Sequence, residues 1–125
     1  MTEEKKYDLG ERTFGFAKRV RAFIKLVKKT ISNFEDLKQL SRSSGSVGAN
    51  FIEAEDNLGE KDFYLRIKIC RKEAKESVYW LNLLDMDETP ELISERDYLI
   101  DEGEQLKKIF GAIITKQKNK SLAKV

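Results

Sequence analysis

The chain has 125 residues and a formal net charge of +2, so it is long enough for one domain with a substantial core but too short for two. One proline and seven glycines supply little turn chemistry for an all-β chain. The charged residues, 37% of the total, are mostly Lys and Glu, which suit helix surfaces, and we therefore expect an all-α protein.

Charge is distributed unevenly along the chain. Seven basic residues and no acidic one lie between Arg12 and Lys29, nine acidic residues and one arginine lie between Asp85 and Glu104, and six lysines and no acid follow from Gln105 onward. This segregation predicts basic surfaces that could meet an anionic partner. The alternative is that the charges are solvated and partly offset one another across neighbouring helices.

The first half of the chain predicts two amphipathic helices, from about Arg12 to Lys29 and from Asn33, as N-cap, to about Asn57. The predicted inward row of the first is Phe14, Ala17, Val20, Ile24, Val27 and Ile31. That of the second is Leu37, Leu40, Ser44, Val47, Phe51, Ala54 and Leu58.

The second half predicts two more helices after a turn near Gly59. The third runs from about Lys61 to Asp85, and the fourth, with Thr89 as N-cap and Pro90 at its first position, runs to about Lys116. The predicted inward row of the third is Phe63, Ile67, Cys70, Ala74, Ser77, Leu81 and Leu84. That of the fourth is Leu92, Leu99, Leu106, Ile109, Phe110 and Ile113.

Four helices joined by short connections predict an antiparallel up-down-up-down four-helix bundle over residues 12–117. The polar residues 1–11 and the basic residues 118–125 are expected to be flexible. No N-terminal segment resembles a signal peptide, and no apolar run approaches the roughly 20 residues needed to span a bilayer. We therefore expect a cytoplasmic protein that does not associate with membranes.

The third helix has a second apolar face beside its core row. Leu65, Ile69, Trp80 and Leu83 lie on this face, together with Glu73 and Glu76. A helix that is apolar on two sides cannot bury both within one four-helix bundle, so the second face is expected to contact another subunit. The alternative is a broad core row with a partly exposed Trp80.

The serine- and glycine-rich segment 41–49 is interpreted as a continuation of the second helix. A phosphate-binding loop is disfavoured, because no strand precedes the segment and the Gly-Lys-Ser/Thr ending is absent. Ser41, Gly45 and Ala49 form a strip of small side chains that would let another helix approach closely. The polar residues beside this strip are expected to pair with Glu73, Glu76 or Arg71, or with a neighbouring subunit. These polar residues are Arg42, Ser46, Asn50 and Glu53.

Several short motifs of the second and third helices form a combined pattern. They are Arg42, Ser46-Val47-Gly48-Ala49-Asn50 with Phe51, Glu53 and Ala54, Lys61-Asp62-Phe63, Glu73-Ala74, Glu76-Ser77 and Tyr79-Trp80-Leu81. Through these motifs, residues 12 to 115 resemble the 23S rRNA intervening-sequence proteins, bacterial four-helix bundles encoded within some large-subunit rRNA genes or elsewhere in the genome. The chain departs from the commonest family pattern at Phe51 and at Ala54-Glu55-Asp56.

The resemblance implies an antiparallel four-helix bundle that assembles into a homopentameric ring with a central channel. It implies no known reaction, and it suggests association with RNA through the family's genomic setting. Similar bundle proteins that accompany reverse transcriptases bind nucleic acid through basic surfaces. The residues expected at subunit contacts are Arg42, Ser46, Asn50, Glu53, Ile69, Glu73, Glu76, Tyr79, Trp80 and Leu83.

The sequence disfavours an enzyme. It contains no histidine, which removes the commonest general base and metal ligand. Its single cysteine, Cys70, cannot form an internal disulfide and lies in an apolar row. The carboxylate pairs Glu53 with Asp56 and Glu73 with Glu76 lack the histidines that a di-iron bundle needs. We expect neither a metal nor an organic cofactor.

Two rows of basic residues are the candidates for nucleic-acid binding. The first helix carries Lys18, Arg21, Lys25 and Lys28, and the third carries Lys61, Lys68, Lys72 and Lys75. Such rows make sequence-independent contacts with phosphates, and no aromatic platform for stacking bases is evident. RNA or another nucleic acid is therefore the expected partner besides other copies of the chain. The alternative is a scaffold that docks a protein and binds no nucleic acid.

Overall fold

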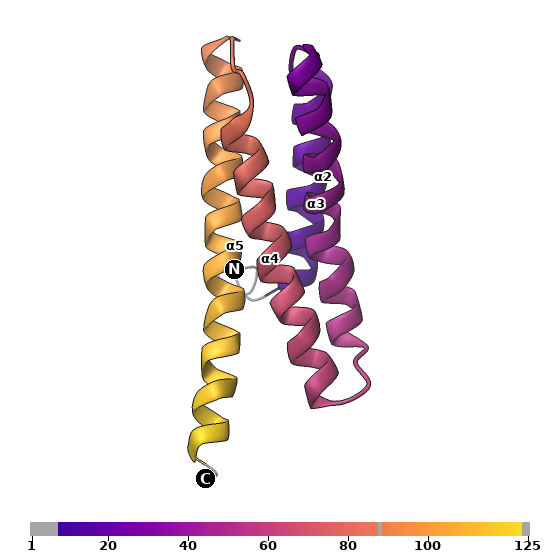
Figure 1. Cartoon of the computed structure of the whole chain (residues 1–125), viewed down its shortest axis with the longest axis vertical. Coiled ribbons are helices and arrows are strands. Elements are labelled where there is room, and N and C mark those ends of the chain that lie inside the picture. The colour runs from indigo at the N-terminus through magenta and orange to yellow at the C-terminus, as the bar shows by residue number, and fades with distance from the viewer. Residues whose placement is uncertain (1–7, 88, 124–125) are drawn as a thin grey trace.

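The computed structural model describes residues 8–87 and 89–123, which form four long helices (Figure 1). These are α2 (Leu9–Leu26), α3 (Ile31–Glu55), α4 (Glu60–Leu83) and α5 (Pro90–Ala123). Each helix contacts the next one in the chain, and α5 also contacts α2, which gives the predicted up-down four-helix bundle. Within the described residues, no helix is both long and apolar enough to cross a membrane.

Side-chain caps determine where α2 and α3 begin. The Asp8 carboxylate accepts a hydrogen bond of 3.0 Å from the amide of Glu11, and the Thr30 hydroxyl accepts one of 3.1 Å from the amide of Asn33. Both bonds satisfy first-turn amides that have no partner within the helix. Because of these caps, α2 begins about one turn before the predicted start, and α3 begins two residues before Asn33. α2 also ends about one turn before the predicted end.

Asn33 is not the N-cap of α3, and the sequence prediction is wrong on this point. Its side-chain NH₂ donates to the carbonyls of Lys28 and Asp85, both at 3.0 Å, and its side-chain oxygen accepts from the amide of Asp85 at 3.0 Å. The residue is 1% exposed. Because these bonds tie the α2–α3 connection to the end of α4, the side chain is not available as a cap.

The remaining helix ends follow turn chemistry. Gly59 precedes α4 with φ of 135°, a conformation that residues with a side chain rarely adopt. Thr89 accepts a bond of 3.4 Å from the amide of Leu92, and α5 begins at Pro90 as predicted. α5 continues to Ala123, so residues 118–123, which were expected to be flexible, are helical. Residues 1–7 and 124–125 of the predicted flexible termini lie outside the described residues.

The core agrees with the prediction in α3 and α4 but only partly in α2. Phe14 and Ile31, assigned to the inward row, are 66% and 91% exposed. α2 is apolar on two adjoining faces. The bundle buries the face that carries Thr13 and Phe16, and it leaves the face that carries Phe14 exposed. Thr13 belongs to the buried face because its hydroxyl donates to the Leu9 carbonyl at 2.7 Å. The buried row of α2 and its continuation is Thr13, Phe16, Val20, Phe23 and Val27.

The predicted rows hold elsewhere with four exceptions, of which Phe63 in α4 and Ile109 in α5 are only partly buried. Leu58 is 94% exposed, because α3 ends at Glu55 and the chain turns away from the core. In α5 the innermost position of the last turns is Ile114 rather than Ile113, which is only partly buried. The buried members of the α4 and α5 rows are Ile67, Cys70, Ala74, Ser77, Leu81, Leu84, Leu92, Leu99, Leu106 and Phe110.

Candidate nucleic-acid interface

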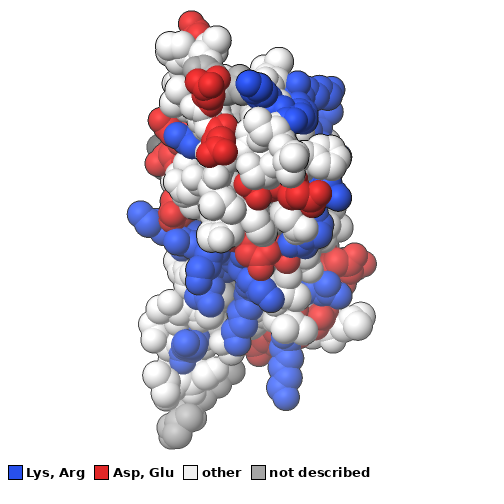
Figure 2. Space-filling view, turned by 45° about the horizontal axis from the view of Figure 1, so that its top comes forward, with Lys and Arg blue, Asp and Glu red and all other residues white. Residues whose placement is uncertain are grey.

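Basic side chains surround a groove between α4 and α5 with a volume of about 730 Å³. It is lined by Lys68, Arg71, Lys72 and Lys75 of α4 and by Lys107 and Gly111 of α5. Steps of three and four residues along α4 place its cations on one side of the helix. Figure 2 shows basic side chains gathered near the middle of one face, with acidic side chains mostly above them.

The α4 cations that line the groove have no acidic partner among the residues that the structure describes, whereas Lys107 of α5 pairs with Glu104 at 2.9 Å. These unpaired side chains are Lys68, Arg71, Lys72 and Lys75. The groove is therefore positively charged. Like charges on one helix side repel each other, and an anion bound between them would relieve that repulsion.

The other predicted cations lie elsewhere. Lys61 is exposed in the first turn of α4, outside the groove. Lys18 and Arg21 border a separate groove between α2 and α3, and Lys25 is exposed. Lys28 lines a third pocket together with Asp85 and Asp87 of the α4–α5 connection. The row predicted on the first helix is thus divided among different surroundings, and it does not adjoin the α4 row.

Two basic residues of the α4–α5 groove, Arg71 and Lys107, are not among the cations predicted to bind nucleic acid. The sequence offers Arg71 as a partner for the polar strip of the second helix, but Arg71 lies on the opposite side of α4, toward α5. Lys107 belongs to the other helix, so no periodicity within α4 could reveal it. The only signal was the change from acidic to basic residues along α5, which marks its second half but not this position.

Two ion pairs join α2 to α5 and neutralise part of the basic first helix. Arg12 donates to Glu102 at 2.7 and 3.0 Å, and Arg19 donates to Glu95 at 2.6 and 3.0 Å. The hydrogen bond from Arg19 lowers the pKa of Glu95. Arg19 also lies 3.6 Å from the centre of the Tyr98 ring. For these arginines the alternative holds, in which charges offset one another across helices.

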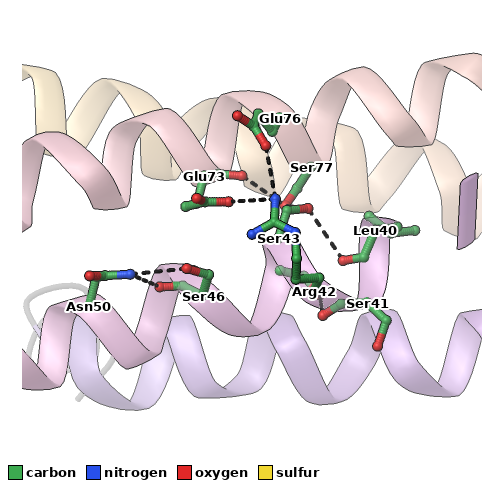
Figure 3. Close-up of polar contacts among 10 residues, drawn as sticks. Leu40, Ser41, Arg42, Ser43, Ser46, Asn50, Glu73, Glu76 and Ser77 are labelled. Carbon is green, nitrogen blue, oxygen red and sulfur yellow. Dashed lines mark hydrogen bonds and ion pairs between the residues drawn. The ribbon is translucent and has the colours of Figure 1, made fainter. Parts of the chain in front are cut away.

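Arg42 of α3 bridges two carboxylates of α4 (Figure 3). Its guanidinium donates to Glu73 at 3.3 Å and to Glu76 at 3.0 Å. Of the partners that the sequence left open, these two are found within the chain, and Arg71 is not among them. Glu73 is 9% exposed and lies at the α3–α4 seam. Glu73 therefore does not lie on the second apolar face of α4, and the sequence prediction is wrong on this point.

The neighbouring polar residues also bond within the bundle. The side-chain NH₂ of Asn50 donates to the Ser46 carbonyl at 2.9 Å and to its hydroxyl at 3.0 Å (Figure 3), and its oxygen accepts from Arg66 at 3.0 Å. Glu53 is exposed and forms no ion pair with the described residues. A buried hydroxyl pair at 2.8 Å, Ser43 with Ser77, was not expected, because Ser43 is hidden in a serine-rich run.

The outer side of α4 retains exposed apolar side chains. Leu65, Tyr79 and Leu83 are 56%, 58% and 48% exposed, and Ile69 is partly buried. Trp80 packs against the core, as the alternative of a broad core row expects, and its indole N–H is buried without an acceptor among the described residues. The outer side of α4 is therefore less apolar than predicted, but it still offers contact area to a partner.

The chemistry of Cys70 is that of a buried structural residue. Its S–H donates to the Val47 carbonyl at 3.3 Å, and burial raises the pKa of the thiol to about 12. The thiol stays protonated at neutral pH, which makes it a poor nucleophile. In the described part of the chain, His, Cys, Asp and Glu side chains form no group of three or more that could hold a metal ion.

Comparison with known proteins gives a consistent result. The model of the family described as 23S rRNA-intervening sequence protein matches residues 5–111. A crystal structure of a protein of unknown function from the S23 ribosomal protein family of Bacteroides thetaiotaomicron is 30% identical, with a TM-score of 0.72. The alignment covers 84% of this chain and 96% of that one. A search of curated proteins gives no match.

Proposed function

The chain belongs to the 23S rRNA-intervening sequence protein family, and from this we propose that it is a non-enzymatic, homo-oligomeric protein that binds RNA through the groove between α4 and α5. The observation that carries the proposal is the row of α4 cations, Lys68 to Lys75, which have no acidic partner among the described residues. Neither the family nor the structural neighbour points to an enzymatic activity.

The groove suits a phosphate backbone better than a base. Its lining consists of cations and one glycine, with no aromatic side chain on which a base could stack. Arg71 can contact a phosphate with two N–H groups, while the lysines act as point charges. Recognition is therefore expected to depend on the shape and charge of the RNA and little on its sequence.

Substitution of two groove lysines tests this function. We expect Lys68→Gln together with Lys72→Gln to weaken binding of a labelled RNA hairpin roughly tenfold at constant salt, because two phosphate contacts are lost. Filter binding measures the dissociation constant. The matched control, Lys18→Gln with Lys25→Gln, removes the same charge from α2. Equal weakening by both pairs would mean that net charge, and not this groove, attracts the RNA.

The oligomer is the second part of the proposal. Support comes from the exposed apolar side chains on the outer side of α4, Leu65, Tyr79 and Leu83. The resemblance to ring-forming family members makes the pentamer the proposed state. Native mass spectrometry is expected to give five times the 14.5 kDa of one chain. A folded single chain at micromolar concentration would refute the assembly.

The competing function is a scaffold that docks a protein and binds no nucleic acid. A second groove, between α2 and α3, has an apolar lining that favours protein contact. The two functions are distinguished by the RNA titration described above. RNA binding that requires Lys68 and Lys72 supports the first, and a defined oligomer without detectable RNA binding at low salt supports the second.

A further inference from the structure

A second groove, with a volume of about 350 Å³, lies between α2 and α3 on the opposite side of the bundle from the α4–α5 groove. Small residues, Gly45, Gly48 and Ala49, form its α3 side. Phe14 of α2 and Ile52 of α3 stand at its edges and are 66% and 62% exposed. Small residues in a groove between two helices let a third helix approach closely, and the large apolar side chains at its edges supply contact area.

The polar members of this groove are mainly cationic. Lys18 lies 6.0 Å from the centre of the Phe14 ring, and Arg21 lies so close to α3 that a Cβ added to Gly45 would be 3.4 Å from its Nη2. Neither Lys18 nor Arg21 forms an ion pair with the described residues. Their charges are therefore available to a ligand.

The combination of an apolar lining and two cations selects the chemistry of the ligand. A nucleic-acid backbone carries closely spaced charges and would leave Phe14, Ala49 and Ile52 against phosphates. An amphipathic helix with carboxylates beside its apolar face matches both parts of the groove. The lining extends from Gly10 to Arg21 along α2, a length of roughly 17 Å, which corresponds to about three turns of a partner helix.

We propose that the α2–α3 groove binds an acidic amphipathic helix of a partner protein. The apolar face of that helix lies between Phe14 and Ile52, and its carboxylates pair with Lys18 and Arg21. The proposal extends the function of the protein beyond RNA association and does not depend on it, because the two grooves share no residue.

The test uses the full chain and a labelled synthetic peptide of about 16 residues made of leucine, alanine and glutamate, with the glutamates beside a leucine face. A second peptide carries lysine in place of glutamate, and a third keeps the glutamates but replaces the leucines with glutamine. Fluorescence anisotropy is expected to detect binding of the first peptide, and at least tenfold weaker binding of the other two. Equal binding of the first and third peptides would reduce the interaction to charge attraction and overturn the proposal.

Variants of the protein locate the binding site. Lys18→Glu and Phe14→Ser, both at exposed positions, are each expected to weaken binding of the first peptide about tenfold. Their matched controls, Lys25→Glu and Phe34→Ser, lie outside the groove lining and should change it less than threefold. Circular dichroism confirms that each variant folds. Equal effects of variants and controls, or no binding of the first peptide, would overturn the proposal.

The same variants separate this proposal from its alternatives. Lys68→Gln with Lys72→Gln should weaken RNA binding about tenfold and leave peptide binding unchanged, so the two functions fail independently. If Phe14→Ser lowers the mass of the assembly in sedimentation while the first peptide does not bind, the groove is occupied by a second copy and the proposed partner is wrong.

Discussion

At the scale of single residues, the bundle depends on buried polar groups that are paired one by one. Arg42 forms an ion pair with the nearly buried Glu73, and the Ser43 hydroxyl is hydrogen-bonded to that of Ser77. Asn33 makes three hydrogen bonds that join the α2–α3 connection to the α4–α5 connection. Each group would be costly to bury alone, so its partner determines whether the site stabilises the fold. This also gives α3 and α4 a fixed register against each other.

Removal of Arg42 tests that dependence. Arg42→Ala leaves Glu73 in the α3–α4 seam without its cation, and we expect the free energy of unfolding to fall by about 1–3 kcal/mol. Urea denaturation measures the change. Lys38→Ala is the matched control, since Lys38 pairs with Glu35 on the exposed surface at 3.7 Å and should matter by less than about 1 kcal/mol. Similar losses in both variants would contradict the role given to Arg42.

The Arg19–Glu95 pair predicts a pH dependence. Arg19 lowers the pKa of Glu95 in the folded state, so the pair stabilises the fold above the ordinary Glu pKa of about 4.3 and loses this effect as pH falls below it. We expect Glu95→Gln to reduce stability at pH 7 by less than about 1 kcal/mol, because the pair is partly exposed, and to have a smaller effect at pH 3. Thermal unfolding at both pH values measures this. A larger effect of Glu95→Gln at pH 3 would show the opposite linkage.

At the scale of elements, α4 and α5 approach closely at Gly103. A Cβ added there would lie 2.7 Å from Cγ2 of Val78, a distance that requires something to move. Val78 is nearly buried and, as a β-branched residue in a helix, has little choice of rotamer. The small residue therefore sets the spacing of the two helices that form the α4–α5 groove.

Alanine substitutions separate spacing from helix propensity. Replacing an interior glycine by alanine gains up to about 1 kcal/mol of helix propensity, and overpacking costs about 1–3 kcal/mol. We expect Gly15→Ala, which has open space around it, to stabilise the protein, and Gly103→Ala to be neutral or destabilising. In a Val78→Ala background Gly103→Ala should become stabilising. Thermal melts of the four variants measure this, and equal stabilisation at Gly15 and Gly103 in the natural background would contradict it.

At the scale of the whole molecule, periodicity and caps predict the four helices, their order and most of the core. They cannot predict how each helix is rotated about its axis when two of its faces are apolar. For that reason the prediction that Phe14 faces the core is wrong. They also cannot show which cations are neutralised. Arg12 and Arg19 are paired by carboxylates far away in the chain, whereas Lys68 is not, and Lys107 joins the groove from another helix.

The salt dependence of RNA binding tests the proposal that RNA occupies the groove between α4 and α5. If the groove contacts three to four phosphates, the logarithm of the association constant should fall against the logarithm of salt concentration with a slope of roughly −2 to −4. Lys68→Gln with Lys72→Gln should make this slope shallower by about 1.5 to 2, and Lys18→Gln with Lys25→Gln should leave it nearly unchanged. Identical slopes for the natural protein and the groove variant would contradict the account.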